Sequence, residues 1–275
     1  MPLILDITPP PGCLVRFISD LHLGHKRGTA PSPAELVGMM EGVGMLVLCG
    51  DTVELRMPGE TQQKSLALRE ELRRLCAARG IQLIELAGNH DPATEPMLAR
   101  FWGGRVAAMH GHSVPDAVSP WSREYLVNAA RVRELIAAHP ASRSQLTARL
   151  ELSRLIAEEL ARLDAAAAAS PQPRKRSMLH ELYHCFWPPG RPLRIVWNWL
   201  TCGRRAERWL RRYLPETEVF IFGHFHRGGK WRYGRRTLLN TGAWFEHATP
   251  YAVDMVDARL LRYFKLNATE KSPHA

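Results

Sequence analysis

Five short polar motifs occur in order along this chain, and each contains side chains that can bind metal ions. They are Asp20-Leu21-His22, Gly50-Asp51, Gly88-Asn89-His90-Asp91, His110-Gly111-His112 and Gly223-His224-Phe225-His226. Carboxylate, amide and imidazole groups together form a mixed oxygen and nitrogen ligand set, which suits Mn, Fe or Zn better than Ca or Mg. A set of this kind is what a two-metal hydrolytic centre requires.

The spacing within the motifs suggests how the ligands divide between two cations. Asp20 and His22 are separated by one residue, so at an extended strand end their side chains point to the same side. Asp51 follows a glycine and can bridge two cations with its two oxygens. We expect His226 to complete the first metal site, and Asn89, His110 and His224 to bind the second metal. Two cations about 4 Å apart can clamp both oxygens of an in-line phosphoryl displacement, so the expected reaction is hydrolysis of a phosphate ester or anhydride.

The fourth motif offers two histidines for one ligand position. His110 directly follows an apolar run, so it is the preferred ligand. His112 is then a substrate contact, or else the alternative ligand.

Short apolar runs precede the motifs and read as β-strands. They cover residues 13–19, 45–49, 81–87, 105–109 and 218–222, and a helix-like segment, 61–79, lies between the second and the third. Strands that alternate with helices predict an α/β layered domain, in which sites form beyond the carboxyl ends of the strands. Residues 230–266 contain further strand-like runs, which we expect to complete a second sheet.

The stretch from 120 to 215 has a different character. Residues 145–163 have a helical apolar face, residues 170–173 read as a loop, and residues 206–214 form an amphipathic helical segment. Residues 174–213 contain ten Lys and Arg but only two acids, together with four of the eight tryptophans. We therefore predict a core formed by residues 1–119 and 216–275, interrupted by a basic, Trp-rich helical insertion at 120–215.

The bulk composition narrows the class of protein. With 275 residues and 45% hydrophobic residues, the chain can bury a substantial core. Its net charge of +10 favours an anionic partner, such as phosphate groups, nucleic acid or an acidic membrane. The five cysteines are odd in number and widely spaced, which predicts free thiols and a reducing compartment. No apolar run is long enough for a transmembrane helix, so the expected location is the cytoplasm.

The ordered motifs, together with Glu54 in Gly50-Asp51-x-x-Glu54, resemble those of the calcineurin-like metallophosphoesterase superfamily. The resemblance covers about residues 13–112 and 218–266. It implies a four-layer αββα sandwich with a dinuclear centre, for which Mn is the first expectation and Fe, Zn and Co are alternatives. It also implies that Asp20, His22, Asp51 and His226 surround one metal and that Asp51, Asn89, His110 and His224 surround the other. His90 would then act at the leaving group, oriented by Asp91.

Within the superfamily, the chain is similar to the UDP-2,3-diacylglucosamine pyrophosphatases of lipid A biosynthesis. The similarity lies in the start Ile18-Ser19-Asp20-Leu21-His22-Leu23 and in the basic, aromatic insertion between the histidine motifs. It implies a lipid-nucleotide substrate, a lid formed by the insertion, and a peripheral position at the inner membrane. On this basis Arg204, Arg205 and Trp209 are candidate substrate contacts, along with His112. That group usually carries arginine at the position of His90.

Two other interpretations stay open. The first is a general phosphodiesterase, nuclease or phosphomonoesterase, in which the basic segment would grip phosphate backbones. The second is a non-enzymatic scaffold that binds a membrane or a protein partner through the basic helix. For the insertion itself, packing or oligomerisation is the alternative to a lid. The sequence does not indicate an oligomeric state.

Overall fold

A computed structural model describes residues 2–56, 59–169 and 191–266, and the chain divides into two compact units. The first unit comprises Met1–Gly111 and Leu214–Ala275, and the second comprises His112–Tyr213. The predicted insertion, 120–215, overlaps the second unit over residues 120–213. The predicted loop at 170–173 and the basic residues of 174–190 lie outside the described residues.

Five strands of the first unit form one sheet in the order β11-β10-β2-β3-β4. Three of them run parallel, β2 (Val15–Ile18), β3 (Met45–Leu48) and β4 (Gln82–Glu85), and β10 (Tyr251–Val256) and β11 (Arg259–Lys265) extend the sheet in antiparallel pairing. All residues of β2 and β3 are buried. Burial of both sheet faces explains why these strands, apart from Arg16, are apolar throughout.

Six strands form the second sheet, in the order β1-β5-β6-β7-β9-β8. They are β1 (Ile4–Ile7), β5 (Leu98–Phe101), β6 (Val106–Met109), β7 (Val219–Phe222), β9 (Arg236–Asn240) and β8 (Gly229–Tyr233). The inner faces of the two sheets share one apolar core. In it Phe17 meets Phe101 edge to face, with ring centroids 5.2 Å apart, and Val47 and Ile221 belong to the same cluster.

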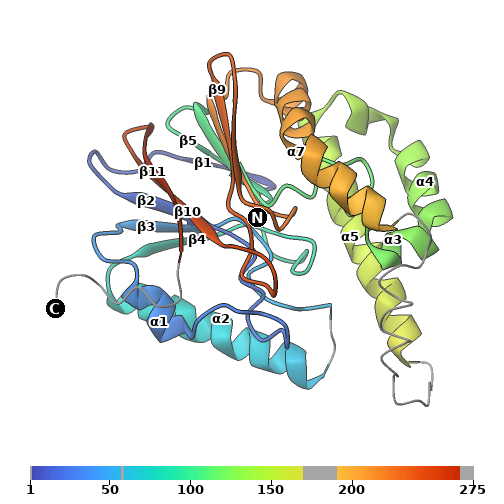
Figure 1. Cartoon of the computed structure of the whole chain (residues 1–275), viewed down its shortest axis with the longest axis horizontal. Helices are drawn as coiled ribbons and strands as arrows, with labels where there is room; N and C mark the ends of the chain where they lie inside the picture. The colour runs from blue at the N-terminus through green and yellow to red at the C-terminus, as the bar shows by residue number, and fades with distance from the viewer. Residues whose placement is uncertain (1, 57–58, 170–190, 267–275) are drawn as a thin grey trace. The chain divides into compact units, whose positions relative to one another are not determined.

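Two helices cover the outer face of the five-stranded sheet (Figure 1). These are α1 (Pro33–Gly38), which begins with a capping box, and α2 (Glu60–Ala78). Leu36 of α1 and Leu72 of α2 pack in one cluster with Leu46 and Leu48 of β3. The first unit is thus mixed α/β, with two stacked sheets and two helices against the five-stranded sheet, which confirms the predicted α/β class.

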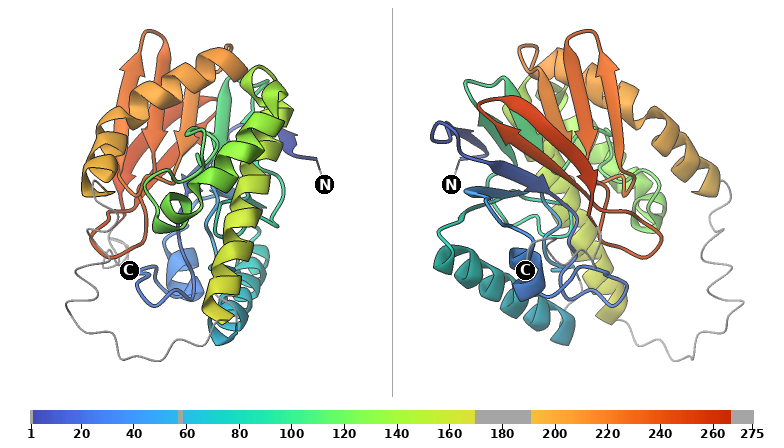
Figure 2. Two further views of the ribbon diagram at one scale, coloured as in Figure 1. Left: turned by 90° about the vertical axis from the view of Figure 1, so that its right-hand side faces the viewer. Right: turned by 60° about the vertical axis from the view of Figure 1, so that its left-hand side comes forward.

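The second unit is helical in its described parts (Figure 2). It contains α3 (Arg123–Val127), α4 (Ala129–Ala138), a 3-10 turn (Pro140–Arg143), α5 (Leu146–Ala169) and α7 (Arg191–Tyr213). Val132 of α4 packs with Leu152, Ile156 and Leu160 of α5. The Tyr213 hydroxyl at the end of α7 donates a hydrogen bond to the Ser142 carbonyl at 2.6 Å. The helical nature of the insertion agrees with the sequence, and its role as a lid stays a prediction.

The prediction for residues 230–266 needs correction. These residues do not complete one sheet: β8 and β9 join the six-stranded sheet, whereas β10 and β11 join the other. The local sequence predicts where strands occur but not which strands pair with each other, because pairing depends on which sheet faces become buried. The five predicted strands occur with trimmed ends, and the cysteines among the described residues are free, as expected. Strands β1 and β5 and helix α1 were not predicted, and the amphipathic helix α7 begins at Arg191, earlier than predicted.

A buried ion pair fastens β10 to β2. The Arg16 guanidinium, 4% exposed, donates to both oxygens of the fully buried Asp254 at 2.7 and 2.8 Å. We expect Asp254→Ala to lower the free energy of unfolding by about 3–5 kcal/mol, because Arg16 would remain buried without its counter-charge. Urea unfolding followed by tryptophan fluorescence measures this change.

The matched control is Arg262→Gln, which removes a second contact to the same carboxylate. The Arg262 side chain is 59% exposed, so its loss should cost less than about 1 kcal/mol. Equal destabilisation by the two substitutions would contradict the assignment of the stabilising role to the buried pair.

Candidate metal centre

The polar motifs follow the carboxyl ends of parallel strands. β2, β3 and β4 run parallel in one sheet, and β6 and β7 run parallel in the other. Main-chain hydrogen bonds join the first two motifs: the Asp20 amide donates to the Gly50 carbonyl at 3.1 Å, and the His22 amide donates to the Asp51 carbonyl at 2.9 Å. Because parallel strands end at a common edge, these motifs come together there.

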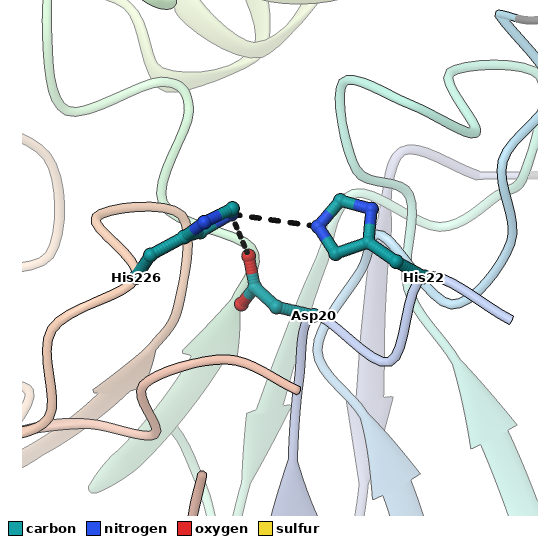
Figure 3. Close-up of side chains that lie close together, drawn as sticks. All are labelled: Asp20, His22 and His226. Carbon is teal, nitrogen blue, oxygen red and sulfur yellow. Dashed lines mark hydrogen bonds and ion pairs between the residues drawn. The ribbon is translucent and has the colours of Figure 1, made fainter. Parts of the chain in front are cut away.

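Two buried carboxylates occupy the middle of the cluster. Asp20 and Asp51 are 0% and 1% exposed. The His110 Nε2 atom lies 3.3 Å from Asp20 Oδ1 and 3.2 Å from Asp51 Oδ2. His226 Nε2 lies 3.3 Å from Asp20 Oδ1 and 3.4 Å from His22 Nε2, and Figure 3 shows these two rings directed toward each other beside Asp20. Side chains from four of the motifs thus meet within hydrogen-bonding range.

The two carboxylates are ionised in spite of their burial. Burial alone would raise the pKa of Asp20, but the His110 and His226 imidazoles outweigh it and hold that pKa well below its usual range. The same opposition, between burial and the imidazoles of His110 and His90, keeps the pKa of Asp51 low. Burial lowers the pKa of His110, but Asp51 and Asp20 raise it more, so the net shift is upward. A divalent cation bound between these groups would supply the positive charge that favours the ionised acids.

The backbone at the motifs is strained. Asp20, His22, Asp51, His224 and His226 all have positive φ angles, of 53°, 45°, 50°, 69° and 51°. This left-handed conformation costs a non-glycine residue about 1–3 kcal/mol, and such strain clusters at functional sites. The concentration of left-handed residues in these motifs indicates one functional site, independently of the side-chain distances.

Two motif glycines leave room for the carboxylates. A Cβ atom on Gly88 would lie 2.0 Å from Asp51 Oδ1, and one on Gly223 would lie 2.0 Å from Asp20 Oδ2. No other residue type fits either position without displacing the carboxylate. The glycines of the third and fifth motifs are therefore part of the construction of the site.

The donor set fits divalent cations. Asn89 is 5% exposed, and its Oδ1 atom accepts no hydrogen bond from any described residue. An unpaired buried acceptor costs about 1–3 kcal/mol, which a bound cation would recover. Three groups of side chains have ligand atoms within 4.8 Å of one another: Asp20, His22 and His226; His22, Asp51 and His90; and Asp20, Asp51 and His110. Buried carboxylates, imidazoles and an amide oxygen are suitable ligands for Mn, Fe, Co or Zn.

His90 has a different partner from the one predicted. Its Nδ1 atom lies 2.7 Å from Oε2 of Glu54, a side chain that is 2% exposed. Burial lowers the pKa of His90, but Asp51 and Glu54 raise it above its usual value. Asp91 instead accepts hydrogen bonds from the main-chain amides of Gly88, Asp51 and Thr52, at 2.7, 3.1 and 2.9 Å. The expectation that Asp91 orients the His90 ring is wrong: Asp91 holds two motif loops together, and Glu54 orients the ring.

Glu54 is a site residue for which the sequence predicted no role. The signal was present in the spacing Asp51-x-x-Glu54, which lies within the second motif. What the spacing does not show is that this turn faces His90, which follows a different strand. Glu54 also lies near His22, with 3.8 Å between Glu54 Oε2 and His22 Nδ1.

The remaining predicted residues divide between the two units. His224 lies in the first unit, where its ring centroid is 4.9 Å from that of His110 and its amide donates to both Asp20 oxygens at 3.2 and 3.1 Å. The predicted substrate contacts His112, Arg204, Arg205 and Trp209 belong to the second unit. His112 is buried there, Arg205 and Trp209 line a cavity, and Arg204 is exposed outside its lining.

No family profile and no curated protein matches the chain. Among solved structures, it is similar to a predicted phosphoesterase from Streptococcus pneumoniae, at 14% identity over 95% of this chain and 94% of the other, with a TM-score of 0.39. It is also similar to vacuolar protein sorting 29 from Cryptosporidium parvum (13%, 93% and 98%, 0.39) and to a cold-active protein-tyrosine phosphatase from a Shewanella species (11%, 97% and 83%, 0.42). With TM-scores this low, the fold and the site rest on the geometry of the chain itself.

The crowding at Gly88 predicts a selective loss of metal binding. Gly88→Ala should weaken binding of Mn²⁺ by about 10- to 100-fold, because the added methyl group displaces the Asp51 carboxylate. Isothermal titration calorimetry with MnCl2 on metal-stripped protein measures this affinity.

Gly38→Ala is the matched control, since a Cβ atom at this position in α1 would meet nothing within 4 Å. It should bind Mn²⁺ as the wild type does. Undiminished binding by a correctly folded Gly88→Ala variant, with its circular dichroism spectrum unchanged, would refute the proposed arrangement of ligands.

Proposed function

We propose that the protein is a hydrolase with a dinuclear metal centre that cleaves phosphoester or pyrophosphate bonds. The observation that carries the proposal is the cluster in which the buried Asp20 and Asp51 carboxylates meet imidazoles from the first, fourth and fifth motifs at 3.2–3.9 Å. Clusters of buried carboxylate and imidazole groups at strand ends fit metal-assisted hydrolysis better than a purely structural role.

The ligands divide as the motif resemblance implies. In this proposal Asp20, His22, Asp51 and His226 hold one cation, and Asp51, Asn89, His110 and His224 hold the other. Bound there, two divalent cations, Mn²⁺ being the first candidate, supply Lewis-acid stabilisation of the phosphate oxygens. The protein contributes rigid placement, because the backbone of five of these residues is held in a strained conformation.

His90 is the proposed proton donor to the leaving group. Its side chain is 27% exposed, whereas the Asp20, Asp51 and His110 side chains at the cluster are 0–2% exposed, so a substrate can reach His90. In this role Glu54 accepts a hydrogen bond from Nδ1 of the protonated His90 ring, and the Nε2 proton is the one donated to the leaving group. A positioned general acid of this kind contributes about 10²- to 10⁴-fold to the rate.

For the substrate, we favour a lipid nucleotide such as UDP-2,3-diacylglucosamine. Support comes from the first-motif resemblance and from the basic, Trp-containing second unit, where His112, Arg204, Arg205 and Trp209 are proposed contacts. A general phosphodiesterase, nuclease or phosphomonoesterase is the alternative enzyme. The non-enzymatic alternative is a membrane- or partner-binding scaffold.

We also propose a peripheral contact with an anionic membrane through α7. Leu193, Val196, Trp197 and Leu200 recur at helical spacing and are 76%, 47%, 61% and 65% exposed. Arginines lie on the same helix, and exposed apolar residues beside basic ones suit the interface of an anionic bilayer. Within the described ranges, no helix combines the length and the apolar character needed to cross a bilayer.

The leaving group provides a test of the role of His90. With Mn²⁺, His90→Asn should lower kcat about 10²- to 10⁴-fold for phenyl phosphate esters, whose leaving group needs a proton, and much less for p-nitrophenyl esters. Asp51→Asn should lower kcat/KM about 100-fold or more for both, because it removes a metal ligand. Steady-state hydrolysis, with release of UMP from UDP-2,3-diacylglucosamine assayed in parallel, measures these effects.

Each outcome separates the candidates. Hydrolysis of aryl phosphodiesters without UMP release would reject the lipid-nucleotide substrate and keep the hydrolase. Salt-sensitive cleavage of DNA or RNA would favour the nuclease. Full binding of two metals without hydrolysis of any of these substrates would favour the scaffold. An equal loss for both leaving groups in His90→Asn would reject proton donation.

The membrane contact is tested on the exposed face of α7. Trp197→Ser should reduce co-sedimentation of the protein with vesicles of phosphatidylglycerol and phosphatidylcholine several-fold, because tryptophan anchors at the interface. The control is Trp102→Phe, a substitution in the first unit that leaves the sequence of α7 unchanged and should bind vesicles like the wild type. Unchanged co-sedimentation of Trp197→Ser would contradict the proposed contact.

A further inference from the structure

The second unit contains a cavity of about 430 Å³ that is distinct in chemistry from the metal cluster. Its lining includes four arginines, Arg149, Arg205, Arg208 and Arg212, and one acid, Asp116. All of these residues lie within the second unit. The volume falls within the range of about 300–1,000 Å³ that is usual for small-ligand pockets.

Three of the arginines come from one face of α7. Arg205, Arg208 and Arg212 are spaced at i, i+3 and i+7, which places them on the same side of a helix. In the described part of the chain, none of the three forms an ion pair with an acid. Arg211 on the same helix, by contrast, pairs with Glu207 at 2.8 Å. The helix therefore contributes three arginines without an acidic partner to the cavity lining, whereas Arg211, outside the lining, is paired with Glu207.

The fourth arginine forms a fixed part of the wall. Arg149 is 4% exposed, and its guanidinium donates to the Ser113 carbonyl at 2.9 and 2.7 Å and to the Pro115 carbonyl at 2.6 Å. Its Nη1 atom lies 3.4 Å from Asp116, whose side chain is 90% exposed. Burial lowers the pKa of Arg149, Asp116 and Tyr213 oppose this shift, and Arg212 adds to it. The exposed Asp116 balances one positive charge at most, so a bound anion would stabilise the remaining guanidinium groups of the lining.

We propose that this cavity binds a diphosphate or triphosphate group. Four guanidinium groups and one carboxylate leave a surplus of positive charge that a polyanion neutralises. Arginine suits phosphate because its planar fork donates two parallel hydrogen bonds. From Arg205 to Arg212 the helix rises about 10 Å, so guanidinium groups reach the cavity from successive turns, which suits a ligand with more than one phosphate. Trp209 and Tyr213, with ring centroids 5.0 Å apart, add an apolar wall for an attached group.

Two lining residues, Arg205 and Trp209, are also proposed substrate contacts, but the cavity contains no proposed metal ligand. Binding is therefore tested with the metal centre empty. Inorganic pyrophosphate is titrated into the full chain in EDTA by isothermal titration calorimetry, with UDP as the esterified counterpart. We expect saturable 1:1 binding that weakens as salt is raised. Arg208→Gln and Arg212→Gln should each weaken it at least tenfold, and Asp51→Asn should leave it unchanged.

The matched control is Arg194→Gln, an exposed arginine on α7 that is not part of the cavity lining. It should change the affinity less than twofold, and thermal melting should show that all variants fold. Tighter binding of UDP than of pyrophosphate would identify an esterified ligand, and the reverse would identify a free polyphosphate; both support the site. Absence of binding, an equal loss in Arg194→Gln, or loss of binding in Asp51→Asn would overturn it. Asp51→Asn lowers hydrolysis in the proposed mechanism but should leave pyrophosphate binding intact, so failure of one proposal is separable from failure of the other.

Discussion

Two ionised carboxylates are buried where parallel strands of the first unit end, and much of its local structure serves to accommodate them. Burying a charge without compensation costs several kcal/mol. Here the compensation comes from imidazoles that arrive on separate loops, from main-chain amides and, at a loaded centre, from cations. His224 contributes in two ways, because its amide donates to Asp20 while its ring lies beside His110. The left-handed residues and the motif glycines follow from the same requirement, since both allow the loops to approach the acids closely.

The packed sheets stabilise the strained loops that carry the buried acids. Strands β2 and β3 are buried on both faces, and the sheets share a core in which Phe17 and Phe101 are in contact. Rigid packing of this kind can hold a strained loop at the end of each strand, because relaxing one loop would disturb neighbours on both sides. Asp91 strengthens the link between two loops through three main-chain amides. Glu54 then acts on a side chain, His90, within a frame that is already fixed.

The two halves of α7 in the second unit differ in the side chains that they present. Arg205, Arg208 and Arg212 face a cavity together with the buried Arg149, whereas the amino-terminal half of α7 exposes apolar side chains such as Leu193 and Trp197. A single amphipathic helix thus presents different chemistry along its length. Part of the net positive charge of the chain is therefore concentrated at the cavity, because Arg205, Arg208 and Arg212 form no ion pair in the described part of the chain, whereas Arg211 is paired with Glu207.

The sequence alone determined the ligand types, their order and their place at strand ends, because apolar runs and polar motifs are local properties of the chain. The preference for His110 over His112 rested on the same local reasoning, and His110 does contact both acids. Tertiary structure decided what depends on distant segments. It paired His90 with Glu54 rather than Asp91, sent the carboxyl-terminal strands to two different sheets, and set Arg149 opposite the arginines of α7. In each case the structure determines which distant segments pair. Such pairing depends on which surfaces are buried together, and a local sequence pattern does not contain that information.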